Sequence, residues 1–450
     1  MNAWFGTEFN RKNTWFDQSK TWIDYQRRSM FMLQQGKPVN DICYFIGEDA
    51  PKLAGARNPE IPAGYSYDYI NADVILNKLF VKDGKLMLPD GMSYKMMVLP
   101  PLTTITPELL QKIKELVQAG AVILGPKPMR SPSLKNYPFA DEKVKALADE
   151  LWGSDSRNDK TTNGLGKGFV LNGITLEKAL SQFKIAKDVT IPLGKPLLFT
   201  HRKTNKEDIY FITNQSDEKQ EADVIFRVNG KQPELWDATN GSSRKLPKFT
   251  STENGTKISL KFEPAESYFI VFAEENTTTS DGENFPTGNI AQEILTPWTV
   301  NFQANKRGPT AAVKFEKLQD WSLHTDEKIK YFSGTATYSN TFNGVLPTGN
   351  ERVFLDLGEV KNMATIKING KAVGGLWTAP WQIDITKFVS SGNNTVEIEV
   401  VNLWVNRMIG DSKLPVKDRP TWLANNYFNP TDALHPSGLL GPVKIKFIKY

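Results

Sequence analysis

Residues 94 to 126 read YKMMVLPPLTTITPELLQKIKELVQAGAVILGP and contain a complete strand–helix–strand unit. An apolar run before the helix and another after it are short and stop at Pro or Gly, as buried strands do. Thr106 is placed to cap the helix, and Pro107 follows at a position that favours proline. Gly120 comes after the last apolar position and predicts the end of the helix. Two strands joined through one helix predict a parallel pair.

Strand and helix signals alternate on both sides of this unit. Residues 41–47 form an apolar run that ends at Gly, and residues 169–171 form another. Residues 69–76 predict a short helix or turn, and residues 175–183 predict a helix. The alternation predicts an α/β domain over residues 37–187, in which a parallel sheet has helices on both faces.

The pattern changes to all-β after this domain. Alternating strands separated by three Asn-Gly turns predict a small β-sandwich over residues 188–275. Residues 276–289 are polar and predict a linker. Many short strands over residues 290–450 predict a second β-sandwich of jelly-roll type.

The N-terminal segment, residues 1–36, is aromatic and polar. Asn13 or Thr14 is placed to cap a helix whose apolar positions recur at helical spacing, and Gly36 ends this pattern. No strand precedes the helix to form a domain with it. We therefore expect the segment to be the tail of a larger domain.

Composition excludes several classes of protein. A length of 450 residues corresponds to about three domains of roughly 150 residues each. The net charge of +5 is small and its charges are interspersed, whereas a nucleic-acid-binding protein would carry a concentrated basic stripe. No apolar run approaches the ~18 residues of a membrane helix. The N-terminus lacks the regions of a secretory signal, so we expect a cytoplasmic chain unless a signal lay upstream.

Several kinds of catalytic site are also disfavoured. Cys43 is the single cysteine, so no intrachain disulfide forms, and its apolar neighbours predict a buried strand thiol. His201, His324 and His435 are far apart and lack the spacing of metal ligands. The G-x-S-x-G motif of a nucleophilic serine is absent. The glycine-rich residues 164–168 precede a strand, which predicts a tight turn in place of a phosphate loop.

Paired carboxyl groups have two interpretations. Glycoside hydrolysis needs two such groups, about 5 to 9.5 Å apart. Glu48 and Asp49 follow the end of a predicted parallel strand, where ligand sites of α/β domains gather. Adjacent acids in a loop are more often solvated, and this interpretation is favoured.

The C-terminal region combines tryptophan with Asn, Asp and Arg over residues 375–381 and 402–411. An indole stacks on the apolar face of a pyranose, while amide and charged groups bind its hydroxyls. This composition predicts a carbohydrate-binding surface. The alternative is that the indoles fill the sandwich core or a domain interface. The predicted substrate-binding residues of this region are Trp377, Trp381, Trp404, Asn406, Arg407 and Asp411.

Seven strings of residues, spread in order over the whole chain, resemble one known family. They are WFGTEFNR (4–11), WIDY (22–25), LQQGKPV (33–39), YFIGED (44–49), LDLG (355–358), ING (368–370) and NLWVNRMIGD (402–411). They resemble the α-L-rhamnosidases of glycoside hydrolase family 106.

This resemblance implies a fold for each part of the chain. Residues 1–36 would be the tail of a (β/α)8 catalytic barrel. The α/β domain, with a flavodoxin-like parallel sheet, resembles the amidotransferase-like or trimerisation domain of other glycosidases, without a catalytic cysteine at the nucleophile turn. The C-terminal sandwich resembles the galactose-binding-like domain of family 2 glycosidases.

The resemblance also implies an activity. The family cleaves terminal α-L-rhamnose from plant polysaccharides such as pectin with inversion, using two glutamates of the barrel and a calcium ion. Those glutamates lie upstream of the residues present here, so no catalytic residue or metal ligand is carried over, and calcium is expected in the intact enzyme. Glu8 and Asn10 would lie at the substrate rim of the barrel. The implied partners are a rhamnose-containing glycan and the missing barrel, in the periplasm or outside the cell.

We therefore expect this chain to be the C-terminal accessory region of a glycoside hydrolase, inactive on its own. The alternative function is a non-catalytic carbohydrate-binding or structural module.

Overall fold

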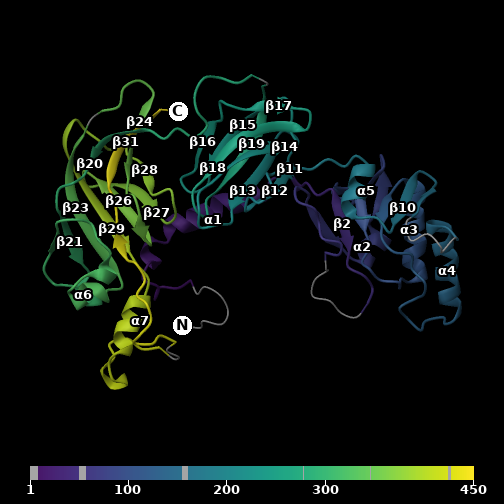
Figure 1. Cartoon of the computed structure of the whole chain (residues 1–450), viewed down its shortest axis with the longest axis horizontal. Coiled ribbons are helices and arrows are strands. Elements are labelled where there is room, and N and C mark those ends of the chain that lie inside the picture. The colour runs from purple at the N-terminus through teal and green to yellow at the C-terminus, as the bar shows by residue number, and fades with distance from the viewer. Residues whose placement is uncertain are drawn as a thin grey trace.

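The structure is a computed structural model that describes residues 9–49, 57–154, 161–276, 278–344, 346–423 and 427–449. Three bodies lie in a row in Figure 1: the α/β domain at one end, the small β-sandwich in the middle and the larger C-terminal β-sandwich at the other end. The chain is mostly β, as the sequence predicts for everything beyond the α/β domain.

The α/β domain is built on one mainly parallel sheet. Strand β2 lies between β3 and β7, and the order continues through β8 and β10 to β9 at the edge. All neighbouring pairs are parallel except β9 with β10. This confirms the predicted parallel sheet. The strands are β2 (Ile42–Phe45), β3 (Tyr67–Ile70), β7 (Met96–Val98), β8 (Val122–Leu124), β9 (Thr161–Leu165) and β10 (Gly168–Asn172).

Helices cover both faces of this sheet. Side chains of α2, α3 and α4 join one buried cluster, and side chains of α5 join the cluster on the other face. The small sheet of β4 (Phe80–Lys82), β5 (Lys85–Met87) and β6 (Ser93–Tyr94) lies beside them. The helices are α2 (Ala72–Asn77), α3 (Pro107–Ala119), α4 (Phe139–Trp152) and α5 (Leu176–Gln182).

Helix α3 forms as its local signals predict. The Thr106 hydroxyl accepts a hydrogen bond from the backbone N–H of Leu109 at 3.4 Å. Gly120 ends the helix with a φ of 126°, a conformation that side chains with a Cβ rarely adopt. Because the predicted apolar stripe is buried against the sheet, local and tertiary preferences agree here.

Two other elements of this domain differ from expectation. Residues 69–76 were predicted as one helix or turn, but Tyr67–Ile70 extends as β3, and Asn71 then caps α2 by accepting from the N–H of Val74. Pairing of β3 with β2 overrides the helical spacing. Helix α4 was not predicted, although acidic residues in its first turn and a buried apolar stripe mark it clearly.

The small β-sandwich packs two antiparallel sheets. One has the order β1-β12-β13-β19-β15-β16 and the other β11-β14-β18-β17. Two predicted Asn-Gly turns, at residues 229–230 and 240–241, lie between strands and are confirmed; at the third, Asn254 lies in the turn and Gly255 begins β18. The strands are β1 (Lys37–Pro38), β11 (Val189–Thr190), β12 (Leu197–Lys203), β13 (Asp208–Asn214), β14 (Gln220–Phe226), β15 (Lys231–Asp237), β16 (Ser242–Lys245), β17 (Thr250–Thr252), β18 (Gly255–Phe262) and β19 (Ser267–Glu275).

The C-terminal sandwich also has two main antiparallel sheets, β20-β31-β24-β28 and β22-β21-β23-β29-β26-β27. A short pair, β25 with β30, and the helices α6 and α7 lie beside them. The elements are β20 (Asn289–Glu293), β21 (Trp298–Phe302), β22 (Val313–Phe315), α6 (Glu327–Lys330), β23 (Thr335–Gly344), β24 (Glu351–Asp356), β25 (Val360–Lys361), β26 (Met363–Ile368), β27 (Lys371–Leu376), β28 (Gln382–Asp384), β29 (Gly392–Val401), α7 (Val405–Ser412), β30 (Gly438–Leu439) and β31 (Lys444–Lys449).

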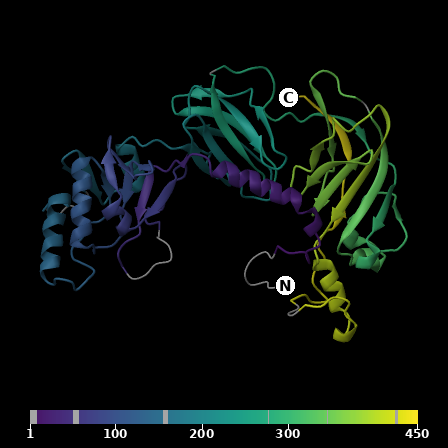
Figure 2. The ribbon, with the colours of Figure 1, turned by 180° about the vertical axis from the view of Figure 1, so that it is seen from behind.

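Helix α1 (Lys20–Leu33) connects the two sandwiches, running under the middle one toward the C-terminal one (Figure 2). Met32 packs into a cluster with strands of the small sandwich, and the Tyr25 ring lies 5.1 Å from the ring of Trp377 in the other. The helix begins later than predicted: a 3-10 turn at Phe16–Gln18 precedes it, and the Thr14 hydroxyl donates to the backbone carbonyl of Asn402 without capping a helix. Within the described ranges, no helix is both long and apolar enough to cross a membrane.

Candidate functional site

A cleft of about 380 Å³ opens at the end of the C-terminal sandwich where β29 stops. Three segments that are distant in sequence form it: the end of β25, the start of α7 and the residues before β30. Its lining residues are Lys361, Asn362, Leu403, Val405, Asn406, His435, Pro436 and Ser437.

Asn406 holds the wall of the cleft from inside. Its side chain is 1% exposed. The Nδ2 group donates to the carbonyl of His435 at 2.7 Å, and Oδ1 accepts from the N–H of the same residue at 2.8 Å. Asn402, also buried, donates from Nδ2 to the Ser437 hydroxyl at 3.1 Å. We call Asn402, Asn406 and Ser437 the amide cluster.

Arg407 and Asp411 form an ion pair along α7. The Nε of Arg407 lies 3.0 Å from Oδ1 of Asp411, at the i,i+4 spacing that brings side chains together on a helix. Asp411 also accepts hydrogen bonds from the backbone and the hydroxyl of Thr421. Both of these hydrogen bonds go to Oδ2, whereas Oδ1 is buried beside Arg407 and accepts no hydrogen bond from the described residues.

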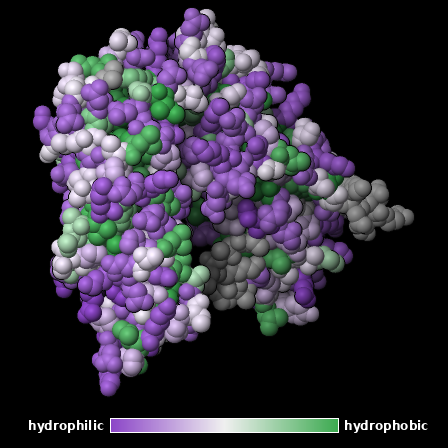
Figure 3. Space-filling model, turned by 60° about the vertical axis from the view of Figure 1, so that its left-hand side comes forward, coloured by the Kyte–Doolittle hydropathy of each residue, from purple (hydrophilic) through white to green (hydrophobic). Residues whose placement is uncertain are grey.

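Each predicted tryptophan contacts another part of the chain. Trp404 donates from Nε1 to the carbonyl of Lys12 at 2.7 Å, and the ring of Trp377 contacts that of Tyr25 at an angle of 56°. Trp381 packs against the core of the C-terminal sandwich. The face seen in Figure 3 carries its hydrophobic residues in small patches among hydrophilic ones. Sugar binding by these tryptophans, Asn406, Arg407 and Asp411 stays a prediction.

The remaining predicted acids and polar residues are placed as follows. Glu8 lies outside the described residues. The Oδ1 of Asn10 accepts from the N–H of Lys12 at 2.8 Å, within a turn. Glu48 accepts from both the N–H and the hydroxyl of Thr106, each at 2.8 Å, and so supports the start of α3.

Sequence reasoning missed a buried charged network between the α/β domain and the small sandwich, which we call the junction network. Its members alternate in charge. Nζ of Lys95 lies 2.9 Å from Asp41, and Arg227 lies 2.6 Å from Asp41 and 3.1 Å from Asp188. Asp41 belongs to the α/β domain and Asp188 to the sandwich side, so the network joins them.

His201 extends the junction network into the small sandwich. Its Nδ1 lies 3.0 Å from Asp188 and its Nε2 lies 3.3 Å from Asp208. Burial acts to lower the pKa of His201, but the two carboxylates outweigh it and raise the pKa above its ordinary value. Burial raises the pKa of Asp208, whereas His201 and Lys203 lower it, and the net shift is downward. The imidazolium form therefore fits this position.

The alternation of residues along two strands could have indicated the junction network. His201 and Asp208 occupy buried positions of β12 and β13, where the alternation calls for apolar residues. Buried ionisable residues of this kind are usually paired. Identification of their partners needed the structure.

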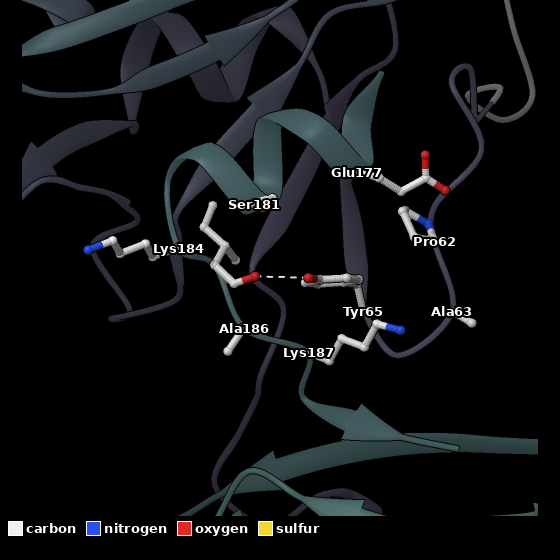
Figure 4. A pocket seen from close by; sticks show the side chains of 9 residues that line it. Pro62, Ala63, Tyr65, Glu177, Ser181, Lys184, Ala186 and Lys187 are labelled. Atoms are coloured by element: carbon white, nitrogen blue, oxygen red, sulfur yellow. Dashed lines mark hydrogen bonds between the residues drawn. The ribbon is translucent and has the colours of Figure 1, made fainter. Parts of the chain in front are cut away.

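A second cavity, of about 550 Å³, lies between α5 and the loop before β3 (Figure 4). The Tyr65 hydroxyl donates to the carbonyl of Ile185 at 2.8 Å across it. In Figure 4, Glu177 and Lys184 extend to opposite sides of Tyr65. Because these charged groups do not converge, the cavity lacks the focused polar groups of a catalytic site.

Comparisons with known proteins agree with this architecture. Residues 1–251 match the family model of α-L-rhamnosidase, family 106. Residues 313–426 match the galactose-binding domain-like model of glycosyl hydrolase family 2. Within the described residues, no group of three or more His, Cys, Asp or Glu is arranged to hold a metal ion.

Two similar proteins cover almost the whole chain. A putative β-glucuronidase of Formosa agariphila is 30% identical over 99% of this chain and 58% of its own length. The rhamnosidase structure from Novosphingobium sp. PP1Y is 34% identical, with a TM-score of 0.89 over 99% of this chain and 42% of that one. This chain thus spans about half the length of each relative. By sequence and by fold, it belongs to the α-L-rhamnosidase family of glycoside hydrolases.

Proposed function

We propose that this chain is an accessory region of a glycoside hydrolase that acts on rhamnose-containing plant glycans, and that it does not hydrolyse them alone. Two findings support this proposal: the chain belongs to the α-L-rhamnosidase family, and it covers 42% of the length of the Novosphingobium rhamnosidase. A catalytic barrel outside this sequence would supply the two carboxyl groups that glycoside hydrolysis requires.

The observation that carries the proposal is a set of exposed apolar side chains on one side of α1. Ile23, Met30 and Phe31 are 41%, 58% and 63% exposed. Their spacing places them on one side of the helix, whereas Tyr25 and Met32 point to the opposite side and pack on the protein. A helix that packs on one face and exposes apolar side chains between charged ones on the other fits a position between two domains.

An aromatic cluster extends this apolar surface toward the N-terminus. The ring of Phe9, which is partly exposed, lies 5.4 to 5.7 Å from the rings of Trp15, Phe16 and Trp22. Aromatic residues are enriched where proteins bind one another, because each buries a large area. A barrel joined to this segment would cover the cluster and the exposed face of α1 together.

We also infer that the α/β domain is flavodoxin-like and amidotransferase-like. Its parallel strands have the order β3-β2-β7-β8-β10, in which the first strand lies between the second and the third. That order is typical of flavodoxin-like sheets. Burial raises the pKa of the Cys43 thiol, which keeps it protonated and unsuited to nucleophilic attack.

Among the described residues, no group of three or more His, Cys, Asp or Glu side chains is arranged to hold an ion such as calcium. We therefore assign no step of the reaction to a metal held by this chain. In the proposed assembly, the ion would belong to the barrel.

Hydrolysis by the purified chain tests the proposal. With 4-nitrophenyl α-L-rhamnoside and excess calcium, we expect nitrophenol release at the rate of the buffer alone. Release above that rate, abolished by heating the protein, would overturn the accessory role.

The exposed face of α1 has its own test. The double variant Met30→Lys/Phe31→Lys should lower the fluorescence of a bound hydrophobic dye and reduce self-association in sedimentation. Stability should change by less than about 0.5 kcal/mol, as for other surface changes. Leu193→Lys, at a fully exposed loop position, is the control and should change neither signal. Equal effects of both variants would contradict a specific docking face.

A further inference from the structure

The cleft at the end of β29 is held open by bonds within its own walls. Lys361 pairs with Gly438 as β25 meets β30, and the N–H of Asn362 donates to the carbonyl of Val401 at 2.9 Å. The amide cluster fixes the third wall through Asn406 and the backbone of His435. A site whose walls are fixed before binding loses less entropy when a ligand arrives.

The polar atoms of the amide cluster are already used. The Asn406 amide donates to His435 and Ser437 and accepts from His435. The Ser437 hydroxyl donates to the carbonyl of His435 and accepts from both asparagines. These residues therefore shape the cleft and leave ligand contacts to their neighbours.

Two lining side chains remain available for a ligand. The carboxamide of Asn362 and the ring of His435 make no hydrogen bond within the part of the chain that the structure describes. A carboxamide offers both donors and an acceptor, and a neutral imidazole offers one of each. Such groups match the hydroxyls of a sugar, each of which both donates and accepts.

The other walls are apolar or neutralised. Leu403, Val405 and Pro436 give the cleft an apolar side suited to the C–H face of a pyranose. Lys361 lies 2.9 Å from Glu359, which offsets its charge. The volume of about 380 Å³ is at the small end of the range for ligand pockets. The site therefore suits one uncharged sugar unit.

We propose that this cleft binds a single neutral sugar residue, with Asn362 and His435 as its hydrogen-bonding groups and Leu403 as part of its apolar wall. The inference shares the ligand class with the proposed function but requires neither hydrolysis nor a barrel. Asn406, which the sequence predicted as a sugar-binding residue, acts here as a positioning residue.

Titration of the ¹⁵N-labelled chain with methyl α-L-rhamnoside tests the inference. We expect saturable shifts of the amide signals of residues 361–362, 403–406 and 435–437, with a dissociation constant on the order of 1 mM. Methyl β-D-glucuronide should bind at least about tenfold more weakly, because the cleft has no unpaired lysine.

Three variants define the site. Asn362→Ala and His435→Ala should each weaken binding about tenfold or more, and Leu403→Trp should block it by filling the cleft. Asn393→Ala is the matched control, because this exposed residue lies at the other end of β29. All four should keep the melting temperature of the wild type.

The outcomes separate this inference from the proposed function. Absence of saturable shifts, shifts centred on Trp377, tighter binding of the glucuronide or equal weakening by Asn393→Ala would each overturn the sugar site. None of these results bears on hydrolysis. Turnover of an aryl rhamnoside would overturn the accessory role and leave the cleft unaffected.

Discussion

The junction network and the amide cluster are both buried and polar, but their chemistry differs. The junction network joins two domains with alternating charges around Arg227 and His201. The amide cluster holds one wall of a cleft with neutral groups. Removal of the partner of a buried charge lowers the free energy of unfolding more than removal of the partner of a buried neutral group. The junction network should therefore contribute more to the free energy of unfolding, and its contribution should change with pH. The amide cluster should shape the cleft, and its contribution should not change with pH.

Loss of Arg227 should have the largest effect. Arg227→Ala removes the cation that Asp41 and Asp188 share and leaves each with one partner, Lys95 or His201, so it should lower the free energy of unfolding by about 3 kcal/mol. Urea denaturation measures this loss. Lys245→Ala is the control, because its ion pair with Glu274 is exposed and should contribute no more than about 1 kcal/mol. Similar losses for both variants would remove the distinction between buried and exposed pairs.

Loss of Asn406 should have the next largest effect. Asn406→Ala leaves both the N–H and the carbonyl of His435 without their partner and should cost about 1–3 kcal/mol. Thermal unfolding measures the change, with Asn393→Ala as a control that should fall within about 0.5 kcal/mol of wild type. A loss as large as that of Arg227→Ala would show that charge is not what separates the two assemblies.

Stability should fall as pH rises, because of His201. Its pKa is raised in the folded protein, so its contribution is complete below its ordinary value of 6.5 and is lost as pH rises through the folded pKa. Glu266 acts in the same direction, since burial raises its pKa to about 7. When folding changes the protonation of one group, the free energy of unfolding changes by at most about 1.4 kcal/mol per pH unit.

Urea midpoints between pH 5.5 and 9 measure this slope. The comparison is made between Glu266→Gln and the double variant Glu266→Gln/His201→Gln, so that only His201 differs. We expect the second variant to have the flatter profile. Parallel profiles would contradict an imidazolium in the junction network, and Asn406→Ala should leave the slope unchanged.

Removal of one hydroxyl should have the smallest effect. Tyr210 donates to Asp188 at 3.3 Å and stacks on His201 with ring centroids 3.8 Å apart. Tyr210→Phe keeps the stacking and should cost about 1 kcal/mol in urea denaturation. A cost above that of Asn406→Ala would mean that this single bond matters more than the amide cluster.

Local sequence signals predicted the parts of the fold that depend on neighbours in the chain. Thr106 and Gly120 bound α3 as expected, and Asn-Gly turns separate strands of the small sandwich. Thr14 was misinterpreted because its hydroxyl bonds Asn402, which is 388 residues away. A tertiary contact at that distance leaves no periodic signal in the sequence.

The sites were harder to predict for the same reason. Arg227 and Asp41 are 186 residues apart, and the cleft combines segments near residues 361, 403 and 435. The sequence pointed to the 402–411 region through its composition. Composition alone does not distinguish Asn406, whose amide is used internally, from Asn362, whose amide remains available.

A single NMR time course tests the account most directly. The labelled chain is mixed with 4-nitrophenyl α-L-rhamnoside, so that protein signals report binding while sugar signals report hydrolysis. We predict saturable shifts of the Asn362 and His435 amides, with the glycoside as intact as in buffer. Accumulation of free L-rhamnose above the buffer control would contradict the account, because the chain would then be a hydrolase on its own.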